Sequence, residues 1–233
     1  MKLLRQADLV ISYSSVIDRH LLANGILRRA RAPLFSTLPP ATVAGEPRRR
    51  VVFAGRVVRP KGVHVLLRAA SMLDAELVIC GDGRDLDSLR SLARRLSMRD
   101  RVSFRGWLAP AALASELADA QVVAIPSVWP EPFGLVGIEA FALGTPVVAS
   151  HTGGIGDWLE HGVSGLTVAP GDAPALAEAL GELLGDPERA RAMGTAGRAS
   201  VAARFTPTHH VNALLAAFNS ARAGWEHRHP SER

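Results

Sequence analysis

The sequence predicts an α/β protein in which a parallel sheet carries helices on both faces. From residue 51 onward, short apolar runs of strand length alternate with longer segments whose apolar residues recur at helical spacing. The chain has 233 residues, 48% of them hydrophobic, which is enough for one large domain with a short appendage. Glycines and charged residues gather in the loops after the apolar runs. This alternation indicates right-handed crossovers between parallel strands.

Residues 1–30 predict a strand and a helix that precede the main domain. A short buried-strand pattern covers residues 8–12, and apolar residues then follow near-helical spacing over 14–24. Gly25 would end that helix. Over residues 31–50 the periodicity is lost and prolines gather, so we expect a linker there.

We expect the main domain over residues 51–205. Its predicted strands are 51–54, 76–80, 101–105, 121–125, 146–149 and 165–168. Its predicted helices are 62–73, 84–96, 110–118, a short helix opening at Gly134, 173–185 and 187–203. Residues 206–233 predict a last helix over 206–223 and a frayed tail from residue 225. Ligands bind beyond the carboxyl ends of parallel strands, so the chemistry should lie in the loops that follow them.

The charge and the single cysteine narrow the class of protein. The formal net charge is +5, yet the basic clusters Arg28–Arg31 and Arg48–Arg50 lack the interleaved aromatic residues of a single-strand binder. We therefore expect no nucleic acid partner. The clusters are either a solvated basic surface or a patch attracted to an anionic membrane.

Cys80 alone excludes an intrachain disulfide and fits a reducing compartment, where it would be an inert core thiol. The N-terminus does not resemble a signal peptide, and no apolar run reaches about 18 residues. We expect a cytoplasmic protein, with weak peripheral association at the inner membrane face as the alternative.

The segment from Glu131 to Glu139 is the most informative motif. It reads Glu-Pro-Phe-Gly-Leu-Val-Gly-Ile-Glu and places two carboxylates eight residues apart around Gly134, which opens a helix. A helix N-terminus offers unpaired N–H groups and suits a phosphate. Paired acids often indicate a glycosidase, but beside an anion site they fit better as acceptors for hydroxyl groups. A nucleotide sugar combines the diphosphate and the hydroxyls that this motif would bind.

Two cations bracket the loop after the first strand of the domain. Arg56 and Lys61 stand at the two ends of the turn before Gly62, and together they can neutralise a diphosphate. The loop is not a P-loop, because it lacks that order of residues. The alternative is a pair of surface cations near a turn.

Glycines and an aromatic residue mark further loops. Gly81 and Gly83 follow the second strand of the domain, but Leu86 stands where a dinucleotide-binding fingerprint needs glycine. That segment either lines a ligand or is a plain turn. Trp107, at the end of the third strand, either faces a planar base or packs in the core. His151 has no acidic partner at fixed spacing, and no residues have the spacing of metal ligands, so we expect no metal.

In order and spacing, these motifs resemble the nucleotide-sugar-binding half of the GT-B glycosyltransferases, specifically glycosyltransferase family 4. The resemblance covers about residues 51–222. The matching segments are Gly55-Arg56 with Lys61-Gly62, Gly81-Asp82-Gly83, 102–106, Glu131-x-Phe133-Gly134-x4-Glu139, 144–149, Gly153-Gly154 and Gly162-x-x-Gly165-Leu166. It implies a Rossmann-like domain and a retaining, metal-independent hexosyl transfer without a cofactor, since the nucleotide-diphosphate sugar is the donor substrate.

The resemblance also implies roles for individual residues. Arg56 and Lys61 would bind the donor diphosphate and, with helix N–H groups, stabilise it as it leaves. The residues expected to serve catalysis are Arg56, Lys61 and Glu131. Glu139 would accept hydrogen bonds from the ribose hydroxyls. Glu131 would hold the transferred sugar together with the backbone of Phe133, Gly134 and Leu135. The other residues expected to line the donor are Gly55, Gly81, Gly83 and Trp107.

The chain departs from that family in size. Complete members have an N-terminal Rossmann-like domain that binds the acceptor, and only residues 1–30 resemble its end. The acceptor half is therefore expected on a separate polypeptide, unless the chain is a truncated fragment. Two functions stay open: a transferase domain with an unknown carbohydrate or lipid-linked acceptor, or a catalytically silent nucleotide-sugar-binding subunit. The failed fingerprint disfavours an NAD-dependent dehydrogenase.

Overall fold

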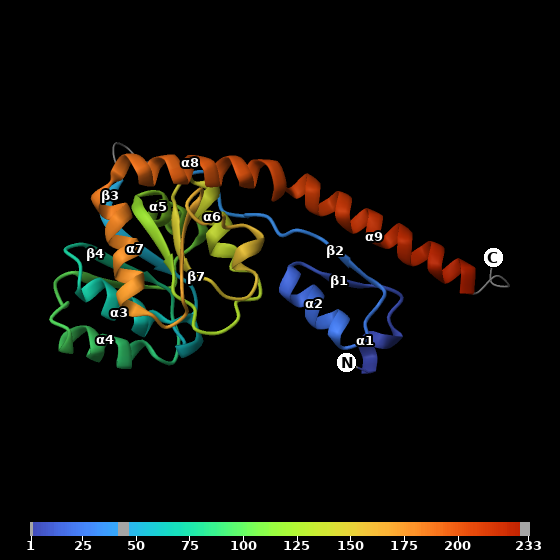
Figure 1. Cartoon of the computed structure of the whole chain (residues 1–233), viewed down its shortest axis with the longest axis horizontal. Helices are drawn as coiled ribbons and strands as arrows, with labels where there is room; N and C mark the ends of the chain where they lie inside the picture. The colour runs from blue at the N-terminus through green and yellow to red at the C-terminus, as the bar shows by residue number, and fades with distance from the viewer. Residues whose placement is uncertain (1, 42–46, 229–233) are drawn as a thin grey trace.

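The computed structural model describes residues 2–41 and 47–228. Figure 1 shows a main domain, in which helices cover both faces of a sheet, and a smaller N-terminal unit beside it. The long last helix runs from the main domain out over the N-terminal unit.

Six strands form one parallel sheet in the order β5-β4-β3-β6-β7-β8. The strands are β3 Arg48–Ala54, β4 Glu76–Cys80, β5 Val102–Gly106, β6 Ala120–Ile125, β7 Val147–Ser150 and β8 Gly165–Val168. The chain runs outward from β3 to β5, then crosses back to β6 and runs outward on the other side. The predicted fold class is confirmed. Strand order reverses between β3 and β6, and this switch point is where open α/β sheets form a ligand crevice.

Each face of the sheet packs its own hydrophobic core. In β3, Val51 and Phe53 belong to the core on one face of the sheet, whereas Val52 and Ala54 belong to the core on the other face. The helices after β3 are α3 Val63–Ser71, α4 Leu86–Arg95, α5 Pro110–Ala118, α6 Leu135–Ala142, α7 Ala173–Gly185, α8 Pro187–Arg204 and α9 Pro207–Arg228. Two 3-10 turns complete the domain, η1 Arg59–Lys61 and η2 Ile155–Asp157.

Strand β3 begins at Arg48, inside the segment for which the sequence predicts a linker. Arg50 is only 4% exposed. Its charge is neutralised there, because Nη2 lies 2.8 Å from a Glu116 oxygen and 3.0 Å from an Asp119 oxygen. The backbone N–H of Arg48 donates to the Asp119 carbonyl at 3.0 Å. Carboxylates at the end of α5 thus neutralise a basic run that resembles a solvated surface, and the strand extends through it.

The other predicted elements differ from the observed ones only at their ends. Helix α3 is shorter than the predicted 62–73, because Gly62 adopts a left-handed conformation at its N-cap and Met72 ends it. Helix α4 is also shorter than the predicted 84–96. Helix α9 extends past residue 225, where the sequence predicts fraying, and the end of that predicted tail lies outside the described residues. Over residues 2–41 and 47–228, no helix is long and apolar enough to cross a membrane.

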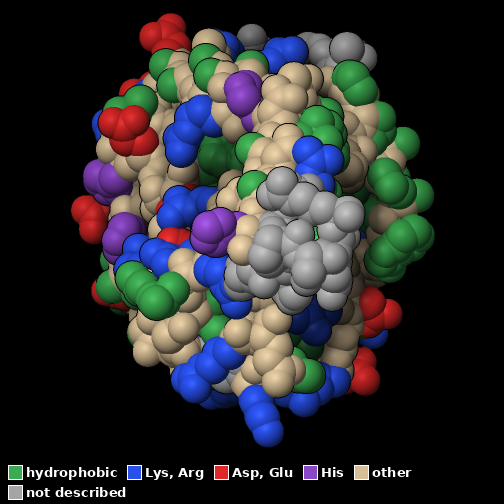
Figure 2. Space-filling view, turned by 90° about the vertical axis from the view of Figure 1, so that its right-hand side faces the viewer, with side chains coloured by type: hydrophobic (Ala, Val, Ile, Leu, Met, Phe, Trp, Pro, Cys, Tyr) green, Lys and Arg blue, Asp and Glu red, His purple; other side chains and the backbone are tan. Residues whose placement is uncertain are grey.

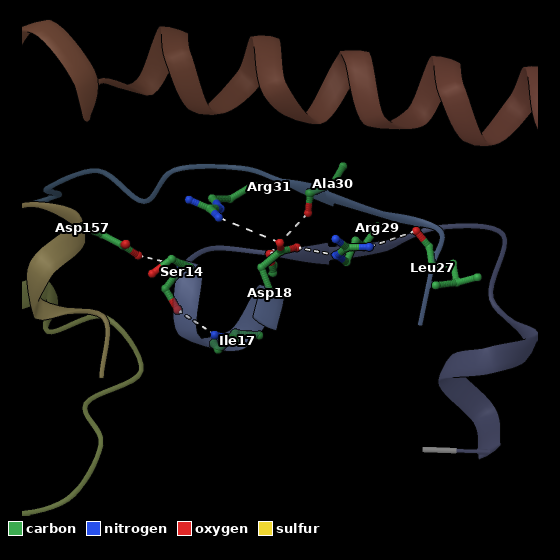
Figure 3. A network of polar contacts seen from close by, with 10 residues as sticks. Ser14, Ile17, Asp18, Leu27, Arg29, Ala30, Arg31 and Asp157 are labelled. Carbon is green, nitrogen blue, oxygen red and sulfur yellow. Dashed lines mark hydrogen bonds and ion pairs between the residues drawn. The ribbon is translucent and has the colours of Figure 1, made fainter. Parts of the chain in front are cut away.

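The N-terminal unit is a β-α-β arrangement with a two-stranded parallel sheet. Its elements are β1 Val10–Ser12, α2 Ser15–Ala23 and β2 Arg29–Arg31, after the short helix α1 Lys2–Gln6. The sequence analysis did not predict β2. Figure 3 shows why a basic segment forms a strand: Asp18 of α2 lies 3.1 Å from Nε of Arg29 and 3.9 Å from Nη2 of Arg31.

Specific contacts hold the N-terminal unit to the main domain. The backbone N–H of Ser15 donates to Oδ2 of Asp157 at 2.6 Å. The ring of Tyr13 packs edge-on against Phe133, with centroids 6.5 Å apart. Farther along, the segment after β2 passes beneath α9 and contacts it through side chains. The unit is therefore docked beside the helix that opens at the switch point.

Candidate functional site

The switch point brings together the loops that follow β3 and β6. The backbone N–H of Val128 donates to the Pro60 carbonyl at 2.9 Å. Gly62 packs directly on the other loop, because a Cβ there would lie 1.8 Å from the Pro126 oxygen, and its φ of +71° also favours glycine. The loop with the two predicted cations is therefore fixed against the loop with the first predicted acid.

A cavity of about 680 Å³ opens between these loops. Arg56, Lys61 and Glu131 line it, so the structure brings together the three residues to which the resemblance assigns catalytic roles. Two residues that the sequence analysis did not single out also line it: Arg84 from the loop after β4, and Trp129, which is 66% exposed. A separate cavity of about 490 Å³ lies at the opposite end of the sheet and shares no residue with this one.

Lys61 and Glu131 form an ion pair in this cavity. The Nζ atom of Lys61 lies 2.8 Å from Oε1 and 2.7 Å from Oε2 of Glu131. The hydroxyl of Ser127 donates to Oε2 at 2.8 Å. Glu131 is only 7% exposed, so these partners offset the cost of burying its charge. Lys61, which is predicted to bind the diphosphate, and Glu131, which is predicted to bind the sugar, are therefore in direct contact.

The cavity has an excess of positive charge. Three cations line it against one carboxylate, and the carboxylate is paired with Lys61. Over the described part of the chain, the guanidinium groups of Arg56 and Arg84 have no hydrogen bond or ion pair. Two unpaired guanidinium groups in one concave site offer forked donors that suit phosphate oxygens.

A second cavity, of about 300 Å³, adjoins the first through Arg56, which lines both. Gly55, Gly81, Trp107 and Val136 also line it. Trp107 is 75% exposed, so the alternative that it packs in the core is wrong. Its indole can stack on a planar group. This cavity suits a base next to a diphosphate.

Glu139 lies in the second turn of α6 and is 7% exposed. Glu139 lies three residues after Val136, which lines the second cavity. Residues three apart share a helix face, so Glu139 lies on the face of α6 that borders this cavity, one turn farther along. It is not among the residues that line either cavity. Among the residues that the structure describes, none donates to its carboxylate. Burial raises the pKa of this carboxyl.

The segment before α6 contributes its backbone rather than its apolar side chains. Gly134 begins the helix in a left-handed conformation, with φ of +82°, and no side chain of the described residues caps the first N–H groups of α6. Phe133 is 3% exposed and packs edge-on against Phe205, so its side chain belongs to the core. The Phe133 carbonyl accepts a hydrogen bond from Nε1–H of Trp158 at 2.6 Å. Leu135 is half-buried at the first turn.

Two predicted glycines are required by contacts between loops. A Cβ on Gly81 would lie 1.9 Å from the Gly55 oxygen, and one on Gly83 would lie 2.3 Å from the Val57 oxygen. Gly81 nevertheless lines the second cavity, whereas Gly83 is not among the residues that line either one. The loop of Gly83 therefore positions its neighbour Arg84 in the first cavity.

Of the remaining candidates, His151 lines neither cavity, whereas Cys80 lines the second one. His151 is exposed. Within the described ranges, no group of three His, Cys, Asp or Glu side chains could hold a metal ion. Cys80 is buried, and burial raises the pKa of its thiol to about 12, as expected for an inert core cysteine.

Comparison with known proteins places these features in a family. A family model described as "Glycosyl transferases group 1" matches residues 36–200. The chain belongs to this family. The match confirms the resemblance that the ordered motifs indicate, and it includes both loops of the switch point.

Two curated proteins illustrate the relationship. The D-inositol 3-phosphate glycosyltransferase of Mycolicibacterium smegmatis is 37% identical over 186 residues, which cover 77% of this chain and 42% of that protein. An uncharacterised glycosyltransferase of Methanocaldococcus jannaschii is 38% identical over 142 residues, which cover 59% of this chain and 36% of that protein. The chain spans less than half the length of these relatives.

Two solved structures share the fold. Sucrose-phosphate synthase from Thermosynechococcus elongatus has a TM-score of 0.85 and 31% identity, covering 94% of this chain and 60% of that one. HepE of Anabaena, solved in complex with UDP-glucose, has a TM-score of 0.83 and 26% identity, covering 91% of this chain and 64% of that one.

Proposed function

We propose that this group 1 glycosyltransferase chain binds a nucleotide-diphosphate sugar and transfers the sugar to an acceptor with retention of configuration. The observation that carries the proposal is the gathering of Arg56, Arg84 and the Lys61–Glu131 pair in one cavity at the switch point. The cations there would hold the diphosphate, and the carboxylate would accept hydrogen bonds from the hydroxyls of the sugar.

The proposed chemistry is stabilisation of the leaving diphosphate. As the bond between the sugar and the diphosphate breaks, negative charge grows on the leaving oxygen. Arg56, Lys61 and the free N–H groups of α6 would stabilise that charge more strongly than they stabilise the ground state. A phosphate oxygen of the donor would take the proton of the acceptor hydroxyl on the same face. Because cations of the chain serve the diphosphate, we expect activity to persist in a metal chelator.

We propose a uridine diphosphate sugar as the first donor to examine. HepE was solved in complex with UDP-glucose, and Trp107 beside the second cavity offers a face for a base. The roles of Glu139 at the ribose and of Gly134 and Leu135 at the sugar remain predictions from the family resemblance. A thermal-shift comparison of UDP-, GDP- and ADP-glucose identifies the base, since a ligand at 100 times its Kd adds about 2.7 kcal/mol of stability.

A catalytically silent donor-binding subunit is the second candidate. The chain spans 36% and 42% of the length of the two curated relatives described above. The acceptor half would then be supplied by another part of the protein or by a separate polypeptide, with a carbohydrate or lipid-linked acceptor. Sugar transfer by the purified chain alone would rule this candidate out.

The test of donor binding is calorimetry of Arg56→Ala and Lys61→Ala with the nucleoside diphosphate. We expect both variants to bind at least about tenfold more weakly, because each loses a charge-assisted contact to phosphate. The circular dichroism spectrum should stay unchanged. Unaltered affinity in both variants refutes the diphosphate site.

We propose a cytoplasmic location with weak peripheral membrane association. Figure 2 looks onto the N-terminal unit and the end of α9, and Lys and Arg side chains gather on this face. The N-terminal unit exposes Arg5, Arg19 and Arg28, together with Leu3 and Leu27. Cations beside exposed leucines suit an anionic lipid surface.

A further inference from the structure

Ser127 is a buried hydroxyl placed on a functional carboxylate. It follows β6 at 1% exposure, and its Oγ donates to Oε2 of Glu131 at 2.8 Å. Within the described residues this is the one hydrogen bond of the Ser127 side chain. A carboxylate has about four acceptor sites, so contacts with Ser127 and Lys61 leave room for a ligand hydroxyl.

The backbones on both sides of this hydrogen bond are fixed by neighbouring loops. Gly62 packs on the Pro126 carbonyl, and Val128 is bonded to Pro60, so the segment around Ser127 is held against the loop that carries Lys61. The carbonyl of Glu131 accepts the N–H of Gly154 at 2.7 Å. The long side chain of Glu131 still has several rotamers, and ordering them costs conformational entropy.

Lys61 and Ser127 both order the Glu131 side chain. A bound nucleotide sugar would compete with Glu131 only for Lys61. In the proposed function, phosphate oxygens attract the ammonium group of Lys61. If Lys61 were the sole partner, the Glu131 carboxylate would follow it toward the diphosphate or lose its orientation. The Ser127 hydroxyl carries no charge and Ser127 is not among the residues that line the cavity, so this hydroxyl can stay on Oε2 when Lys61 turns to phosphate.

We infer that Ser127 is a positioning residue for the transferred sugar, holding Glu131 so that its carboxylate receives the sugar hydroxyls while Lys61 serves the diphosphate. This inference rests on the proposed function of the same cavity. It assigns Ser127 to the sugar and not to the nucleotide. A substitution of Ser127 should therefore weaken the binding of a nucleotide sugar more than the binding of the matching nucleoside diphosphate.

The test measures two dissociation constants for each variant by calorimetry. The probes are the glucose donor that stabilises the protein in the screen of UDP-, GDP- and ADP-glucose, and its nucleoside diphosphate. In Ser127→Ala, we expect the affinity for the nucleotide sugar to fall about tenfold, since a hydrogen bond to a charged group is lost. The affinity for the diphosphate alone should change less than about twofold. Ser127→Thr, which keeps the hydroxyl, should restore much of the loss.

Two further variants separate positioning from general damage. Ser164→Ala removes an equally buried hydroxyl, 3% exposed and bonded to the Glu160 backbone, and should leave both affinities unchanged. Glu131→Gln alone should raise the ratio of the Kd for the nucleotide sugar to the Kd for the nucleoside diphosphate. Adding Ser127→Ala to Glu131→Gln should then change the ratio no further, because Ser127 acts through Glu131.

The outcomes distinguish this inference from the proposed function. Three outcomes overturn the positioning role and leave the donor site standing. In Ser127→Ala the binding of both probes is weakened equally, or the binding of neither is weakened, or the effects in the double variant are additive. If Ser127→Ala fails to fold, the comparison of Ser127→Thr with Glu131→Gln decides: a ratio as high in Ser127→Thr as in Glu131→Gln overturns the role. If the wild-type chain binds none of the glucose donors, the proposed function fails and this inference fails with it.

Discussion

Glu139 shows, at the scale of one residue, a conflict between stability and function. Its carboxylate is 7% exposed, and burial raises its pKa. No described residue donates to it. A buried charge without a partner destabilises the fold, and such sites persist where a ligand supplies the missing donor. Ribose hydroxyls would be those donors.

The pH dependence of stability follows from this shift. The folded chain binds the Glu139 proton more tightly than the unfolded chain, so the contribution of this group declines as pH rises through the raised folded pKa. Relative to the wild type, Glu139→Gln should therefore gain free energy of unfolding between about pH 4 and pH 7. Urea denaturation at both pH values measures the gain. Glu178→Gln, an exposed glutamate on α7, is the control and should show no such trend.

The same variant should lose function. Glu139→Gln keeps the shape of the side chain but offers a weaker acceptor, so nucleoside diphosphate binding should fall by about tenfold. A variant that gains stability at neutral pH while keeping full affinity would remove Glu139 from the donor site.

At the scale of elements, the site depends on two loops that pack at the switch point. Gly62 sits where a Cβ would lie 1.8 Å from the Pro126 oxygen. Backbone atoms cannot move aside as a flexible side chain can. The contact therefore holds the loop of Lys61 against the loop of Glu131, where the two side chains pair at 2.7 Å.

Gly62→Ala should cost about 3 kcal/mol or more, since it combines a strained positive φ with a backbone clash. Gly162→Ala is the matched control. Its φ of +78° is similar, but nothing lies within 4 Å of its Cβ position, so only about 1 kcal/mol should be lost. Chemical denaturation compares the two variants. Equal losses would show that the loops do not pack as closely as the structure indicates.

Strand β3 makes a second element-scale prediction. Arg50→Ala should cost about 3 kcal/mol, because it removes a buried guanidinium and leaves the half-buried carboxylates of Glu116 and Asp119 with fewer partners. Arg49→Ala should cost less than about 1 kcal/mol, since its side chain is 56% exposed. Thermal unfolding separates the two, and similar Tm values would contradict the buried ion cluster.

The elements that sequence reasoning predicts well are those with local signals. Apolar periodicity is a property of neighbouring residues, so the alternating strands and helices after residue 51 are visible without a structure. The start of β3 and the whole of β2 are not, because the acids that neutralise their arginines lie elsewhere in the chain. The same reason applies to the site. Arg56, Lys61 and Glu131 belong to motifs, whereas Arg84 becomes a candidate only when distant loops meet. Ser127 and Trp129 share the loop of Glu131, but only the folded loop shows that one donates to Glu131 and the other lines the cavity.

At the scale of the whole molecule, the chain divides its surface between a cationic donor site and a basic N-terminal face. Figure 2 shows that Lys and Arg side chains gather over the N-terminal unit and the end of α9. Exposed leucines accompany them, notably Leu3 at 81% and Leu27 at 72%. If the proposed membrane association holds, each cation near an anionic surface would contribute about 1 kcal/mol.

Sedimentation with vesicles tests this attraction. The chain should bind vesicles of mixed phosphatidylserine and phosphatidylcholine, and binding should weaken at high salt. Arg19→Glu with Arg28→Glu should abolish it, because two exposed cations of the N-terminal unit are reversed. Arg99→Glu, exposed beyond α4 in the main domain, should have little effect. Equal effects of all reversals would point to net charge and not to this face.

A crystal structure of the chain with UDP or the nucleoside diphosphate that the thermal screen selects is the most direct measurement. We predict the diphosphate between Arg56, Lys61 and the start of α6, the base beside Trp107 and the ribose hydroxyls on Glu139. Phosphates bound elsewhere, for example at the opposite end of the sheet in the cavity around Arg49, would contradict the account.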